Sequence, residues 1–126
     1  MKAMVCFRTA KGRFAVPVES ARAVRLTEGL TTLPGQRPDV VGILPGDPPL
    51  VVLAILGTGG EHVLVLTSNH VDFGLQVQEV VGVQRIDDAR VGPPPGGLEG
   101  GLVVGTLRGS GDVVLIVDAD VMAARL

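Results

Sequence analysis

The segment from residue 73 to 86, FGLQVQEVVGVQRI, carries the most informative pattern of apolar and polar residues in the chain. Phe73, Leu75 and Val77 fall on one face of an extended strand, because successive side chains of a strand point to opposite faces. The alternation lapses at Glu79, which falls on the apolar face, and Gly82 follows shortly after it. A strand with such a lapse usually bends or bulges. We therefore predict a bend or bulge that lets the two halves of this strand serve two sheets in turn.

The rest of the chain consists largely of short apolar segments that are separated by glycine and proline. Segments of this kind predict short strands and tight turns, and their close spacing is typical of an all-β barrel or sandwich. The continuous apolar run at 50–56 indicates a strand that is covered on both faces. The strands that we predict besides 73–86 are residues 3–7, 13–18, 40–44, 50–56, 61–67, 101–107 and 112–117.

Signals for helices are few. Residues 19–25, ESARAVR, fit either one or two helical turns or an irregular strand. Asp118 or Asp120 could cap a short final helix that runs to Leu126. Residues 90–101 contain three consecutive prolines, which cannot join a central sheet. We interpret this last segment as a long ordered loop, because strand sequence resumes directly after it.

Composition narrows the classes of function. A chain of 126 residues suits one compact domain or two very small fused barrels, and 46% hydrophobic residues are enough for a core. A net charge of −2 argues against nucleic-acid binding, which needs a basic face. With three Phe, no Trp and no Tyr, the chain has few rings on which a base or a sugar could stack.

The N-terminus and the single cysteine favour a cytoplasmic protein. Cys6 lies in an apolar run and has no second cysteine with which to form a disulfide, so we interpret it as a buried, inert thiol. The first residues lack the apolar core of a signal peptide. The longest apolar run, 50–56, is much too short to span a bilayer, so we expect no direct membrane insertion.

No motif in the chain predicts catalysis, a metal or a cofactor. His62 and His70 lack the three or four convergent ligands of a zinc site, and we interpret both as residues of surface turns. The paired carboxylates at 87–88 and at 118 and 120 fit turn and cap positions, because no calcium-loop pattern surrounds them. The glycine clusters at 57–60 and 96–101 lead into strand and lack the Gly-Lys-Ser/Thr of a P-loop. We therefore expect no enzymatic activity.

Several apolar motifs follow one another in an order that is more specific than any single motif. They are FAVPV at 14–18, LP at 33–34 with VGIL at 41–44, PLVVL at 49–53, FGLQV at 73–77 with the valines up to Val83, Ile86 with 90–95, GTL at 105–107 and LIVD at 115–118. In this order and spacing the chain resembles the CheW-like family, the adaptor domain of bacterial chemotaxis arrays, from about Val5 to Met122.

The resemblance implies a single domain, residues 1–126, made of two intertwined SH3-like five-stranded barrels that share chain segments, with one or two short helices. It implies an adaptor without catalysis, which connects the regulatory domain of a chemotaxis histidine kinase to the cytoplasmic tip of chemoreceptors. In that fold the lapse after residue 77 falls where a strand passes between barrels. We expect 73–77 to pack in one barrel's core, and the residues after Gly82 to lie near the second barrel or the groove.

The chain departs from the family's pattern at charged positions. The arginine that many members carry after the glycine-led strand is missing from Leu44-Pro45-Gly46, and Ala23 takes the place of an acidic residue. The family's aspartate has no counterpart near 52–54, and Gln78 takes the place of another. These changes suggest a diverged docking surface. The residues that we predict for protein interaction are Val24, Gly42, Leu44, Gly46, Val80, Val81 and Gly82.

Other functions stay open at this point. One is a degenerate CheW-like protein with a different partner. Another is a small β-barrel that binds a peptide or a metabolite without a kinase partner, which a closed apolar pocket along residues 50–56 would favour. An enzyme would need a cleft that gathers His62 or His70 with a carboxylate.

Overall fold

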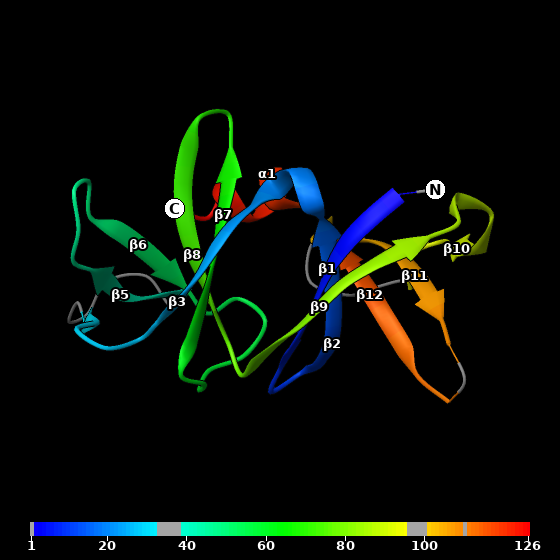
Figure 1. The fold of residues 1–126 in the computed structure, drawn as a ribbon, viewed down its shortest axis with the longest axis horizontal. Helices are drawn as coiled ribbons and strands as arrows, with labels where there is room; N and C mark the ends of the chain where they lie inside the picture. Colours follow the sequence, from blue (N-terminus) through cyan, green and yellow to red (C-terminus); the bar gives the residue numbers. More distant parts are fainter. Residues whose placement is uncertain (1, 33–38, 96–100, 110) are drawn as a thin grey trace.

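The computed structural model describes residues 2–32, 39–95, 101–109 and 111–126. Within these ranges the chain forms two β-sheets, two short 3-10 helices and one short α-helix, so the expected all-β class is confirmed. The two sheets occupy the two halves of the molecule, and α1 (Ala119–Ala123) lies between them (Figure 1). The elements that follow are those that the described ranges contain.

The first sheet combines the two ends of the chain. Its strand order is β10-β11-β12-β2-β1-β9, in which β12 runs parallel to β2 and the other pairs are antiparallel. The N-terminal strands therefore lie between strands from the C-terminal half. The strands are β1 (Lys2–Thr9), β2 (Gly12–Pro17), β9 (Glu79–Ile86), β10 (Val91–Gly92), β11 (Val103–Arg108) and β12 (Val113–Val117).

The second sheet is built from the middle of the chain. Its order is β3-β7-β8-β6-β5-β4, in which β6 runs parallel to β8. Because the first sheet takes strands from before and after this segment, the two subdomains are intertwined, as expected. Each sheet has five longer strands and one strand of two residues, β10 or β4. The strands are β3 (Ala21–Leu26), β4 (Thr31–Thr32), β5 (Val40–Leu44), β6 (Leu50–Leu53), β7 (His62–Ser68) and β8 (Val71–Val77).

The chain passes from the second sheet to the first at Gln78, which separates β8 from β9. Beyond it the register between β1 and β9 shifts, since Phe7 pairs with Val80 whereas Cys6 pairs with Gly82. Val81 is the extra residue of this β-bulge, and Gly82 follows with a φ of 144°, a conformation that glycine adopts readily. The predicted bend is confirmed, and it consists of a break at Gln78 and a bulge at Val81. Figure 1 shows the chain passing from β8 in one half of the molecule to β9 in the other.

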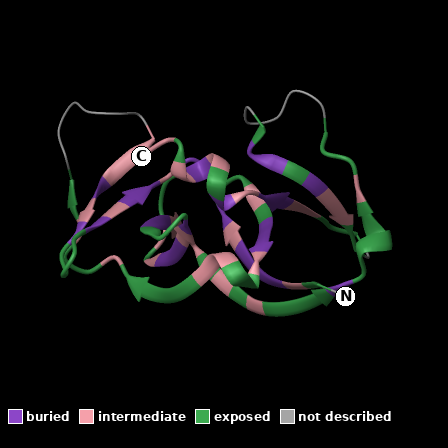
Figure 2. Ribbon diagram, turned by 90° about the horizontal axis from the view of Figure 1, so that it is seen from above, coloured by how far each residue is buried: buried purple, intermediate pink, exposed green. Residues whose placement is uncertain are grey.

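The largest hydrophobic core lies between the two sheets and takes residues from both. Phe7 and Val16 of the first sheet contribute to it, as do Leu64 and Leu66 of the second. Phe73, Leu75 and Val77 pack in the same core. The strand 73–77 therefore stabilises the contact between the barrels and is not confined to the core of one of them. Buried residues accordingly gather where the two halves meet (Figure 2).

Each barrel also has a small core of its own. The core of the first barrel consists of Met4, Cys6, Ala15, Ile86 and Ile116. That of the second consists of Leu44, Leu50, Val52, Val63 and Val65. Met122 of α1 is fully buried in the shared core, so the C-terminal helix is packed against both barrels.

Several local predictions need adjustment. Strand β6 ends at Leu53, and the buried residues Ile55 and Leu56 follow it in a turn. The segment 19–25 divides into a 3-10 helix, Val18–Ser20, and strand β3, which settles the choice between a helical turn and a strand. The predicted final helix is present but ends at Ala123 instead of Leu126, and the Asp118 side chain caps it by accepting a hydrogen bond from the Asp120 backbone N–H at 2.8 Å. The motif at 33–34 and residues 96–100 of the predicted loop lie outside the described residues.

Candidate docking surfaces

Strand β3 is an exposed edge of the second sheet. It is the end strand of the sheet order, paired on one side with β7, and all of its residues after Ala21 are exposed. Two of its apolar side chains, Val24 and Leu26, are 49% and 57% exposed. An edge strand presents backbone donors and acceptors together with its side chains, and so it can receive a partner's strand or helix.

Strand β9 is the corresponding edge of the first sheet. It pairs with β1 on one side and ends the sheet order. Val81 and Val83 are each 62% exposed, the highest exposure of any large apolar residue described. Val81 is the extra residue of the bulge and has no partner in the pairing between β1 and β9. The two edge strands together give the molecule an apolar surface on both barrels.

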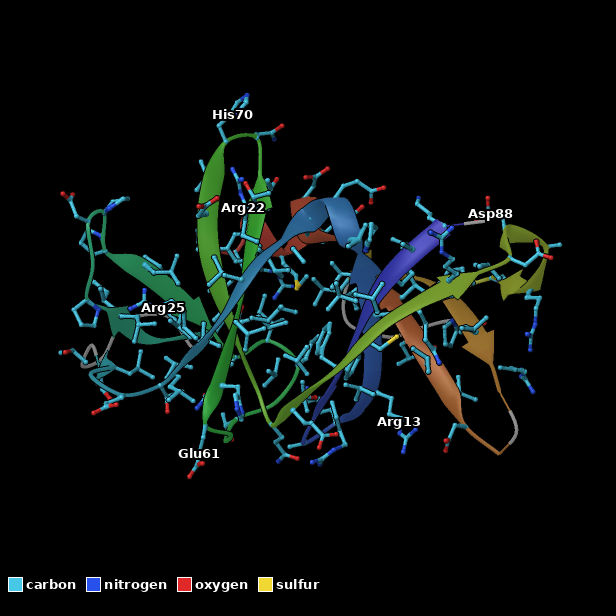
Figure 3. All side chains as sticks on the ribbon, in the orientation of Figure 1. Arg13, Arg22, Arg25, Glu61, His70 and Asp88 are labelled. Atoms are coloured by element: carbon cyan, nitrogen blue, oxygen red, sulfur yellow. The ribbon has the colours of Figure 1, made fainter. Side chains whose placement is uncertain are left out.

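A cationic side chain lies beside the turn that follows β5. Arg25, on β3, donates a hydrogen bond from Nη2 to the backbone oxygen of Pro45 at 3.2 Å. Gly46 is close to the same guanidinium, because a Cβ atom built on Gly46 would lie 3.7 Å from Arg25 Nη1. Arg22, which precedes Arg25 on β3, forms an ion pair with Asp72 at 3.7 Å. Figure 3 shows Arg25 and Arg22 at different heights along this strand.

Five of the predicted interaction residues lie where a partner could reach them. Val24, Val81 and Gly46 are exposed, and Val80 and Gly82 are half-buried. These positions come from β3, from the turn after β5 and from the bulged part of β9. Their role in binding stays a prediction.

Two of the predicted interaction residues, Gly42 and Leu44, are not surface residues, and this part of the prediction is wrong. Leu44 is fully buried in the core of the second barrel. Gly42 is buried and pairs with Thr32 of the neighbouring strand β4, and a Cβ atom at Gly42 would lie 2.1 Å from the backbone oxygen of Thr31. Its glycine therefore serves close strand packing instead of contact with a partner.

Sequence reasoning missed three exposed residues: Leu26, Val83 and Arg25. The alternation of β3, ARAVRL, does not reveal which face is buried, because a strand at the edge of a sheet buries little of either face. Val83 follows a bulge that moves it relative to the preceding residues. The Arg25 side chain reaches the turn that contains Pro45 only in the closed barrel. The spacing of the two residues in the sequence therefore does not predict their contact.

The residues with chemical potential occupy structural positions. His70 is exposed in a tight turn with a φ of 66°, as expected, whereas His62 lies half-buried on β7 and is not a turn residue. Asp87 caps the 3-10 helix Asp88–Arg90 by accepting from the Ala89 N–H, which confirms its predicted cap role. Burial raises the pKa of the Cys6 thiol, in agreement with a buried, inert cysteine. Among the described residues, no three His, Cys, Asp or Glu side chains form a group that could hold a metal ion.

A comparison with protein families decides the relationship of this chain. A model of the CheW-like domain matches residues 49–126. The chain belongs to the CheW-like domain family. The matched region includes β6 to α1 and therefore contains the crossing strand pair β8–β9 and the C-terminal strands of the first barrel. The search of the curated proteins found no match.

The fold of this CheW-like protein is also that of a solved scaffolding protein. The crystal structure of TtCheW from Thermoanaerobacter tengcongensis is similar with a TM-score of 0.82 at 19% sequence identity. The match covers 94% of this chain and 84% of that chain. At this identity the likeness shows that the two proteins share a fold. In the part of the CheW-like chain that is described, no helix has the length and apolar character needed to cross a membrane.

Proposed function

We propose that this protein is a non-enzymatic cytoplasmic adaptor of chemotaxis signalling, which couples a histidine kinase to chemoreceptors. The observation that carries the proposal is the CheW-like family match over residues 49–126. The partners would be the regulatory domain of the kinase and the cytoplasmic tip of a receptor. Such an adaptor acts by holding two partners in a fixed relation, which couples their states without any chemistry of its own.

The architecture supports this role. The two barrels share their largest core, so the protein is a stiff body that can transmit a fixed geometry between two bound partners. The exposed edge strands β3 and β9 offer one apolar docking surface on each barrel. An interface needs a desolvated apolar centre, and Val24, Leu26, Val81 and Val83 supply such side chains.

The test is titration of the purified full chain with the regulatory domain of a chemotaxis kinase and, separately, with a receptor tip fragment, both from the same genome. We expect saturable binding to at least one of them by calorimetry. Val24→Asp and Val81→Asp should each weaken binding to one partner at least tenfold, because a carboxylate placed in an apolar interface must be desolvated. The absence of binding to both partners at high micromolar concentration would contradict the adaptor role.

A matched control separates docking from general effects on the surface. Val71 is 50% exposed, nearly the same as Val24, but lies at the start of β8 beside the turn that carries His70. Val71→Asp should leave both affinities unchanged. If Val71→Asp weakens binding as much as Val24→Asp does, the assignment of β3 as a docking edge is wrong even where the partners bind.

A further inference from the structure

The first barrel has an open mouth between the two ends of its sheet. Strands β9 and β10 end the sheet order and are not paired with each other. A cavity of about 380 Å³ is lined by residues of β1, β2, β9, β11 and β12 and by Asp87 and Arg90 at the 3-10 helix that follows β9. This volume falls in the range of natural small-molecule sites, which are concave and mostly apolar with a few polar groups. The cavity is in the other barrel from the strand at residues 50–53.

The inner wall of this cavity is apolar. Cys6, Leu107 and Val114 line it. Phe7 and Phe14 also reach the cavity, but their rings, stacked with centroids 5.8 Å apart, are only 1% and 2% exposed and pack in the core between the two sheets. A small apolar body can pack against the wall that the first three residues form.

The rim of the cavity carries an excess of positive charge. Four arginines and two aspartates line the cavity: Arg13, Arg85, Arg90, Arg108, Asp87 and Asp112. Both aspartates have partners already. Asp112 forms an ion pair with Arg13 at 3.1 Å, and Asp87 accepts from the Ala89 backbone N–H at 3.1 Å.

The other three arginines of the rim have no carboxylate partner among the described residues. Arg90 Nη2 donates to the backbone oxygen of Arg108 at 3.4 Å, which holds the Arg90 guanidinium beside β11. Arg85 approaches from β9 on the other side of the mouth. Guanidinium groups bind carboxylates in a planar, two-point arrangement, so this rim is suited to a carboxylate.

We propose that the mouth of the first barrel is a binding site for a compact carboxylate with an apolar body. The apolar body would pack against the wall that Cys6, Leu107 and Val114 form, and the carboxylate would meet Arg85, Arg90 or Arg108 at the rim. The site goes beyond the adaptor function and does not depend on it. The apolar wall and the cationic rim are both required, because neither a purely apolar molecule nor a small inorganic anion satisfies the two together.

Calorimetric titration of the full chain tests this site. Phenylacetate, which combines a compact apolar body with a carboxylate, should bind saturably, whereas its neutral analogue phenylacetamide should not.

Substitutions at the rim test the role of the charge. Arg85→Gln and Arg108→Gln should each weaken phenylacetate binding about tenfold, the effect expected for losing a hydrogen bond to a charged group. Arg22→Gln is the matched control, because Arg22 is an exposed arginine on β3 that does not line the cavity. It should leave phenylacetate binding unchanged. Circular dichroism should confirm that all three variants fold.

Three results would overturn the proposal. The first is that phenylacetate does not bind to the full chain. The second is that phenylacetamide binds as well as phenylacetate, which would show that the rim does not select a carboxylate. The third is equal weakening by Arg22→Gln and by the rim variants, which would indicate binding elsewhere on the protein.

Discussion

The Arg25 side chain of β3 donates a hydrogen bond to the backbone oxygen of Pro45, which lies in the turn after β5, although β3 and β5 are not neighbours in the sheet. Closure of the second barrel brings them together. The family resemblance implies an arginine in the turn that holds Leu44-Pro45-Gly46, and this chain has none there. Arg25 therefore places a guanidinium beside the turn from a different strand.

We predict that Arg25→Ala weakens binding to the kinase regulatory domain or to the receptor tip, because the turn after β5 then loses its cation. A decrease of about tenfold corresponds to the loss of one charge-assisted contact in an interface. The comparison is Arg22→Ala on the same strand, which removes an exposed ion pair with Asp72 and should change the affinity little. Equal effects of the two substitutions in calorimetric titration would refute a special role for Arg25.

Gly42 is the position at which we expect the greatest sensitivity to an added methyl group. A Cβ atom there would lie 2.1 Å from the backbone oxygen of Thr31, a distance that no folded chain tolerates without moving a strand. Gly42→Ala should lower the free energy of unfolding by about 1–3 kcal/mol, the usual cost of overpacking. Chemical denaturation measures this difference.

Gly109 is the control for this substitution, because a Cβ atom there would lie 3.9 Å from the backbone oxygen of Asp112, an ordinary van der Waals distance. Gly109→Ala should change the free energy of unfolding by much less than Gly42→Ala. Denaturation midpoints that are the same for the two variants would show that β4 moves away from Gly42 at little cost.

The Cys6 thiol should make the stability of the protein depend on alkaline pH. Burial raises its pKa in the folded state above the ordinary value for cysteine, so the unfolded chain loses this proton first as the pH rises. The stabilising contribution of Cys6 is complete below the ordinary pKa and is lost as the pH rises toward the folded pKa. The difference in free energy of unfolding between the wild type and Cys6→Ala should therefore decrease with rising pH. A difference that is constant across this range would contradict the burial effect.

The sequence predicts the strands of this protein well where a local pattern decides them. The lapse after residue 77 indicated a bend, and the structure has both the break at Gln78 and the bulge at Val81. Asp118 was identified as a possible cap because short side chains with an oxygen satisfy the first backbone N–H groups of a helix. These features depend on residues that are close together in the chain.

What the sequence could not predict depends on closure of the barrels. Leu44 and Gly42 read as part of a docking surface, but β4 and the core of the second barrel cover them. The sequence predicts His62 in a surface turn, but His62 is the first residue of β7. The cavity of the first barrel is lined by residues from distant parts of the chain, so no local sequence pattern predicts it. Exposure at an edge strand is likewise decided by which strands pair.

The crossing point between the barrels offers a last test, at the hydrogen bonds between Gln78 and Arg8. The Gln78 backbone N–H donates to the Arg8 backbone oxygen at 2.9 Å, and Arg8 Nη1 donates to Gln78 Oε1 at 2.6 Å. Gln78→Glu keeps the length of the side chain and converts the second hydrogen bond into an ion pair, in keeping with the acidic residue that the family resemblance implies here. Because both side chains are half-buried, we expect a gain in the free energy of unfolding of up to about 1 kcal/mol at low salt, which decreases at high salt.

Gln78→Met should instead lower the free energy of unfolding by about 1–2 kcal/mol, since Arg8 loses its acceptor. Urea denaturation at two salt concentrations separates the two effects. If Gln78→Met were as stable as the wild type, the Arg8–Gln78 contact would not hold the crossing strand in place.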